Sequence, residues 1–188
     1  MRRLTPEWRI QRFLDDIDYD VAGVACRSPR RVLHERSAQC LDGALFAAAA
    51  LRVHGRPPLI MDLEAVHDDD HVVAVFQRHG RWGAIARSNY SGLRFREPVF
   101  RTLRELALSY FESYFNLRRE KTLRRYSVAV DLSRFDARRW MTAEDDLWEI
   151  GAHLVDVRHF GLLTPAVERD LSRVDRRSFD AGKLGRRG

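Results

Sequence analysis

Hydrophobic positions in residues 37–55, SAQCLDGALFAAAALRVHG, recur at helical spacing and predict a buried helix. Ser37 is a good N-cap residue for this helix, and Gly55 is a typical residue just past a helix end. Cys40 lies on the same face as a run of alanines, whose small side chains let another element pack very close. The pattern therefore predicts a thiol in the first turn of a closely packed helix.

The region after this helix alternates between short apolar runs and turn signals, which is typical of an antiparallel meander. The expected strands are 59–66, 71–77, 82–86 and 126–132. A glycine-containing turn is expected at 79–81, between the second and third of them. These elements predict an α+β fold, in which a sheet of about four antiparallel strands packs on the cysteine-bearing helix.

The chain length favours one domain, over residues 1–175, with its core at about 28–132. A helical C-terminal extension is expected at 142–175, because Thr142 and Thr164 are good helix-capping residues. Residues 176–188 are rich in glycine and arginine and are expected to form a disordered basic tail.

Composition favours a folded protein: 45% of the 188 residues are hydrophobic and 32% are charged. No apolar run approaches the roughly 20 residues of a membrane helix. Charges interrupt the N-terminal residues where a signal peptide would have its apolar region, so a cytoplasmic location and no membrane partner are expected. The two cysteines, Cys26 and Cys40, are expected to be free thiols.

The net charge is +6, and only two of the 33 basic residues are lysines. Arginine-rich segments at 94–106 and 116–126 carry interleaved aromatic residues, which is one feature of nucleic-acid surfaces. Helical spacing of the apolar positions at 103–111 favours a core helix instead, so a nucleic-acid partner is not favoured. Three arginines near the expected site could select an anionic substrate: Arg94, Arg96 and Arg101.

Cys40 and His71 form the strongest candidate for chemistry. A helix N-terminus and a neighbouring histidine both favour the thiolate, the nucleophilic form of cysteine. His71 opens an apolar strand that could lie against the alanine face of the Cys40 helix. Asn89 or Ser88, just past the next strand, could orient the imidazole, and the Cys40 N–H with the Gln39 side chain could hold an oxyanion. The alternative for Cys40 is a structural buried thiol.

Two segments resemble blocks of the transglutaminase-like superfamily: AQCLDGALFAAAALRVHGRPP and DDDHVVAVFQRHGRWGAI. Cys40 and His71 stand in the superfamily's order, 31 residues apart, which suggests a divergent bacterial member. The resemblance implies a papain-like core with Cys40 as nucleophile and His71 as base. The family's third residue is usually Asp, whereas this chain has Arg87, Ser88 and Asn89 at that place.

These features predict thiol-dependent acyl chemistry on an amide, either hydrolysis or transfer, with a peptide, protein or small amide as substrate. The alternative is a binding module that keeps the fold without the chemistry, which the missing acid favours. No cofactor is expected. His67 and His71 flank three aspartates, but a solvated acidic turn is favoured over a metal site because no further ligands complete one.

Overall fold

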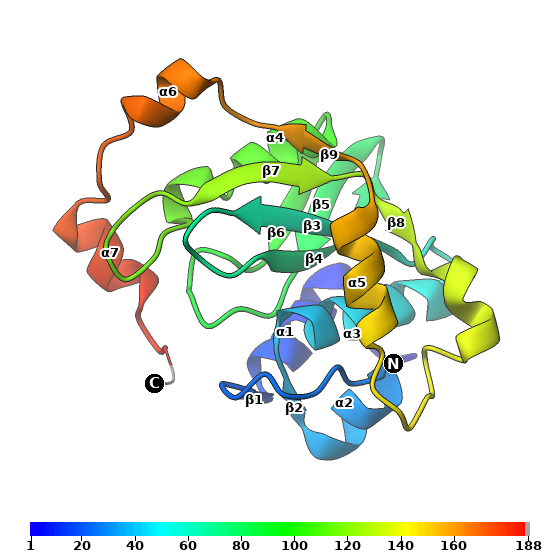
Figure 1. Cartoon of the computed structure of the whole chain (residues 1–188). Helices are drawn as coiled ribbons and strands as arrows, with labels where there is room; N and C mark the ends of the chain where they lie inside the picture. Colours follow the sequence, from blue (N-terminus) through cyan, green and yellow to red (C-terminus); the bar gives the residue numbers. More distant parts are fainter. Residues whose placement is uncertain (187–188) are drawn as a thin grey trace.

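The computed structural model of the chain describes residues 1–186 and has an α+β fold, with helices around a large antiparallel sheet (Figure 1). Its elements in chain order are α1 (Glu7–Asp15), β1 (Asp18–Tyr19), α2 (Pro29–Glu35), β2 (Ser37–Ala38), α3 (Cys40–Val53), β3 (Leu59–Ala65), β4 (His71–Arg78), β5 (Arg81–Ile85), β6 (Arg96–Phe100), α4 (Leu103–Leu108), the 3-10 helix η1 (Phe111–Ser113), β7 (Leu123–Ser127), β8 (Val130–Asp131), the 3-10 helix η2 (Leu132–Arg138), α5 (Trp148–Asp156), β9 (His159–Gly161), α6 (Pro165–Arg169) and α7 (Arg176–Gly182). Across residues 1–186, no helix has the length and apolar character needed to cross a bilayer.

The large sheet has seven strands within residues 1–186, in the order β6-β5-β4-β3-β7-β9, with β8 also paired to β3. The predicted number of about four strands was wrong. The four expected strands are present as β3, β4, β5 and the pair β7 and β8. Strands β6 and β9 of this sheet were not predicted from the sequence. Both are short, and β6 contains Pro98, so neither shows the apolar alternation that predicts a strand.

Helix α3 packs closely on one face of the sheet, against β4 (Figure 1). Its alanines at 44 and 47–50 are fully buried in one cluster with Val72, Ala74 and Phe76 of β4. Gly43 marks a close approach to the segment that follows β5, since a Cβ there would lie 2.3 Å from the Cβ of Arg87. The predicted close packing of the cysteine-bearing helix on the sheet is confirmed.

The other face of the sheet carries a second apolar cluster, which α4 and η1 cover. Met61 and Leu63 of β3, together with Val73 of β4, pack there against the buried rings of Tyr110 and Tyr114. Alternate residues of the central strands therefore enter different clusters, as the two-residue period of a strand requires. The sheet is buried on both faces, so its central strands have fixed positions.

The predicted turn after β4 is confirmed as a two-residue hairpin loop. His79 and Gly80 both have positive φ, 51° and 70°, and Arg78 pairs with Arg81 across the loop. Two positive φ values are the signature of a turn whose twist matches antiparallel strands. This hairpin brings the end of β5 back beside the start of β4, which is the end of the sheet that holds His71.

The C-terminal part differs from the sequence-based expectation. The helix expected from Thr142 begins later, at α5, because the preceding segment is tied to the region around Cys26. Asp146 accepts a hydrogen bond from the Cys26 N–H (3.2 Å), and the Leu147 N–H donates to the Cys26 carbonyl (2.9 Å). Residues 176–182, expected to be disordered, form α7, with Asp175 as its N-cap. Residues 187–188 of the expected tail lie outside the described part.

The close approach at Gly43 predicts a large effect of a single methyl group. We expect Gly43→Ala to reduce the free energy of unfolding by about 2 kcal/mol, since its Cβ would overlap the Arg87 side chain. Gly151→Ala is the matched control in α5, where the nearest atom is a flexible Leu41 methyl at 3.3 Å. That change should stay within about 1 kcal/mol. Equal urea-denaturation midpoints for the two variants would contradict the packing described here.

Candidate active site

Cys40 is the first residue of α3, and the N-cap of this helix is Gln39. The Gln39 side chain accepts a hydrogen bond from the Asp42 N–H, and the Asp42 carboxylate accepts one from the Gln39 N–H (3.3 Å), which forms a capping box. The expectation that Ser37 caps the helix was wrong, because Ser37 pairs with Asp18 between β1 and β2. Cys40 is therefore the residue directly after the N-cap.

His71 is the first residue of β4 and pairs with Leu63 of β3. Its side chain is buried, and Nε2 lies 2.9 Å from the carbonyl oxygen of Leu93. A carbonyl only accepts, so Nε2 carries the proton in the neutral ring and Nδ1 is the basic nitrogen. The edge of the ring packs against Tyr114, at 6.4 Å between centroids. Leu93 thus fixes both the orientation and the tautomer of the imidazole.

The Leu93 carbonyl stands where the sequence led us to expect the side chain of Asn89 or Ser88. Both predicted residues lie nearby and line the same cavity as His71. The Ser88 hydroxyl accepts a hydrogen bond from the Tyr90 N–H at 3.0 Å, which shapes the loop after β5. A main-chain carbonyl is present at every residue, so no sequence pattern could have singled out Leu93.

The Cys40 thiol points toward two acceptors, Gln39 Oε1 at 3.6 Å and the Asp70 carbonyl at 3.9 Å. The backbone N–H groups of Leu41 and Val72 in turn donate to the sulfur. Within residues 1–186, no hydrogen bond joins the sulfur to the His71 ring. The two side chains line the same cavity.

Burial favours the neutral forms of both Cys40 and His71. It raises the pKa of the Cys40 thiol to about 11 against the two backbone donors, and the charges of Asp42 and Asp62 act in the same direction as burial. Burial also lowers the pKa of His71 to about 4, although the Leu93 carbonyl favours the protonated ring. The expected lowering of the thiol pKa by the helix N-terminus is therefore outweighed by burial.

All five predicted site residues line one cavity of about 540 Å³, which we call the Cys40 cavity. Its walls also hold side chains that the sequence did not mark as part of a site. The aromatic ones are Tyr19, Tyr90, Tyr114, Phe115 and Trp148, and the charged ones are Asp20, Asp68, Asp69, Asp70 and Arg186. Among these side chains, only the run of three aspartates before His71 forms a recognisable sequence pattern, and that pattern favours a solvated acidic turn.

The arginines considered for an anionic substrate do not line the Cys40 cavity. Arg94 forms an ion pair with Asp15. The Arg96 guanidinium lies over the Tyr110 ring at 4.0 Å and donates to the Gly92 carbonyl at 2.7 Å. Both arginines are held by structural contacts, so the geometry does not support their use in selecting an anion.

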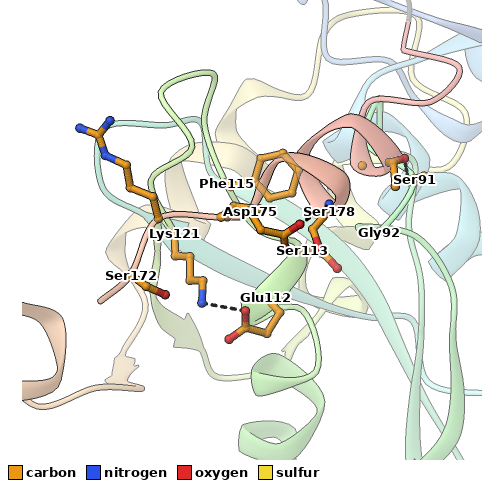
Figure 2. Close-up of a pocket in the computed structure, with 13 residues that line it drawn as sticks. Ser91, Gly92, Glu112, Ser113, Phe115, Lys121, Ser172, Asp175 and Ser178 are labelled. Carbon is orange, nitrogen blue, oxygen red and sulfur yellow. Dashed lines mark hydrogen bonds and ion pairs between the residues drawn. The ribbon is translucent and has the colours of Figure 1, made fainter. Parts of the chain in front are cut away.

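A second cavity, of about 430 Å³, lies between η1 and α7 (Figure 2). Several serines line it, and Lys121 pairs with Glu112 there at 2.8 Å. It contains neither Cys40 nor His71, so it is separate from the candidate active site. Over residues 1–186, no group of three His, Cys, Asp or Glu side chains is arranged to hold a metal ion.

No family model matches this chain, and no curated protein matches it. The candidate active site rests on the positions of Cys40 and His71, on the His71 tautomer that the Leu93 carbonyl selects, and on the cavity that both residues line.

The lowered pKa of His71 predicts a specific acid sensitivity. The unfolded chain binds a proton near pH 6.5 and the folded chain only near pH 4, so His71 lowers stability as pH falls through this window. The stability of wild type relative to His71→Asn should fall by about 3 kcal/mol between pH 7 and pH 4, following the pKa difference. Urea denaturation at several pH values measures this. His79→Asn, in the exposed turn, is the control; a His71→Asn difference that stays constant with pH would contradict the burial described here.

Proposed function

We propose that the protein carries out acyl chemistry on amide bonds, by hydrolysis or by transfer to an amine, with Cys40 as nucleophile and His71 as general base. The observation that carries the proposal is the hydrogen bond from His71 Nε2 to the Leu93 carbonyl, which makes Nδ1 the nitrogen that would take a proton, in a ring that lines the same cavity as Cys40. Peptides, proteins and small amides are the substrate classes we consider.

The neutral pair favours a mechanism in which attack and proton transfer occur together. As Cys40 Sγ bonds to the substrate carbonyl carbon, its proton passes to His71 Nδ1. The resulting imidazolium then protonates the leaving nitrogen as the C–N bond breaks, which leaves a thioester on Cys40. Water or an amine attacks the thioester in the second half, and His71 takes and returns a proton again.

Charge on the substrate oxygen would be stabilised at the start of α3. The Cys40 N–H belongs to the first turn of the helix, where N–H groups lack intrahelical partners. The Gln39 side-chain oxygen is used by the capping box and by the thiol, so its NH₂ group is the part that could contribute a second donor. This sharpens the prediction that Gln39 helps to hold an oxyanion.

We also propose that the chain has a papain-like core and belongs to the transglutaminase-like superfamily. Support comes from the order of its parts: a cysteine at the start of a central helix, a histidine at the start of a following strand, and a polar loop after the next strand. Cytoplasmic location remains part of this proposal.

A binding module without catalysis is the second candidate. It is favoured by the neutral acceptor on His71, since a carbonyl stabilises imidazolium less than a carboxylate does, and by the raised pKa of the Cys40 thiol. The two candidates differ in whether Cys40 becomes acylated.

Acylation by p-nitrophenyl acetate tests the catalytic proposal. We expect intact-mass spectrometry to show one acetyl group on wild type and none on Cys40→Ala, and His71→Gln to slow acylation at least about 100-fold. His79→Gln is the matched control. Because neutral His71 is the base, the rate should rise with pH through about 4 and level off, well below the pKa of the thiol. Equal acylation of wild type and His71→Gln would support the binding module instead.

A further inference from the structure

The Cys40 cavity differs in charge from the rest of the chain. The whole protein carries a net charge of +6, yet this cavity is lined by four aspartates and one arginine. Three of the aspartates are engaged: Asp20 pairs with Arg27 at 2.6 Å, and Asp68 and Asp70 accept hydrogen bonds within the protein. Asp69 is exposed, and its carboxylate has no hydrogen-bond or ion-pair partner within residues 1–186.

A cationic side chain from the same chain already lies in this cavity. The Arg186 guanidinium sits over the ring of Tyr90, 5.6 Å from its centroid, and makes no ion pair within residues 1–186. Arg186, Asp68 and Asp69 all act electrostatically on the Tyr90 phenol, which places them around one ring. An aromatic face beside a carboxylate is a favourable place for a guanidinium or ammonium group.

Helix α7 delivers Arg186 to this position. Ser91 donates hydrogen bonds from its N–H to the Gly182 carbonyl and from its hydroxyl to the Ala181 carbonyl, each at 2.9 Å. Phe179 packs on Phe115, with 5.5 Å between ring centroids. Figure 1 shows the chain leaving α7 toward β1. These contacts hold α7 beside the loop after β5, and the Arg186 N–H in turn donates to the Lys183 carbonyl at 2.9 Å.

The cavity lining also includes exposed apolar side chains. Trp148 is 46% exposed and Val21 is 55% exposed, and both line the cavity. The cavity thus combines exposed apolar side chains, the Cys40 thiol, and a carboxylate and an aromatic ring from Asp69 and Tyr90.

We propose that the rim formed by Asp69 and Tyr90 binds an arginine or lysine side chain of a polypeptide substrate, next to the amide that reacts at Cys40. Arg186 occupies this rim in the absence of substrate and competes with it. The inference rests on the proposed function for the reacting amide, whereas the charge preference of the rim is testable without any catalysis.

Charged thiol reagents measure that preference at Cys40 itself. A methanethiosulfonate forms a mixed disulfide with the thiolate and releases methanesulfinate, and it can carry a trimethylammonium or a sulfonate group at the same distance. The cationic reagent should modify Cys40 at least about tenfold faster than the anionic one at low salt, and added salt should reduce the ratio. Peptide mapping distinguishes Cys40 from Cys26, which is fully buried.

Two variants assign the preference to the rim. Asp69→Asn should lower the cation-to-anion ratio several-fold, whereas Glu97→Gln, the same charge change on an exposed residue of β6 outside the cavity, should leave it nearly unchanged. Arg186→Ala should raise the rate with the cationic reagent, and Arg186→Lys should behave like wild type. A ratio near one, or equal effects of Asp69→Asn and Glu97→Gln, would overturn the proposal.

Peptide protection identifies the ligand class. A short blocked peptide containing arginine should protect Cys40 from a neutral methanethiosulfonate, and the same peptide with citrulline, which is uncharged and nearly isosteric, should protect at least several-fold less. Equal protection by the two peptides, or equal protection by agmatine alone, would overturn a polypeptide-cation subsite. If the charge ratio is present while His71→Gln leaves acylation unchanged, the rim is retained and the catalytic proposal fails; the reverse result removes only the rim.

Discussion

The packing of α3 on β4 is the contact on which the candidate site depends. The alanine face of α3 packs on β4, and Gly43 lets the helix lie so close to the segment after β5 that a Cβ at residue 43 would overlap Arg87. Because α3 begins at Cys40 and β4 begins at His71, this packing brings both starting residues to the same end of the fold. The sheet is buried on both faces, so neither element can shift without disturbing a core cluster.

Burial has a second consequence, which concerns protonation. The environment that fixes Cys40 and His71 also disfavours charge on each of them, raising one pKa and lowering the other. A permanent thiolate–imidazolium pair is therefore not the resting state. In the proposed mechanism the neutral ring, whose tautomer a main-chain carbonyl selects, acts as the general base. The acidic rim, with Arg186 beside it, adds a preference for cations that the strongly basic composition of the chain conceals.

Periodicity and turn chemistry were sufficient to predict the central helix, the strands β3, β4 and β5, and the hairpin at His79. In the structure, all five candidate side chains line one cavity. The rest depends on contacts between distant segments. Gln39 is the N-cap because Ser37 is held by β1, α5 starts late because Asp146 is tied to Cys26, and α7 forms where Phe179 meets Phe115. The acceptor for His71 is a backbone atom, which no residue pattern marks.

The most direct test of the account is the tautomer and charge of His71, read from ¹⁵N chemical shifts of its ring by NMR. The structure predicts a neutral ring at pH 7, with the proton on Nε2, that becomes protonated only near pH 4. A proton on Nδ1, or an imidazolium at pH 7, would contradict the account, because Nδ1 would then be unable to accept the Cys40 proton.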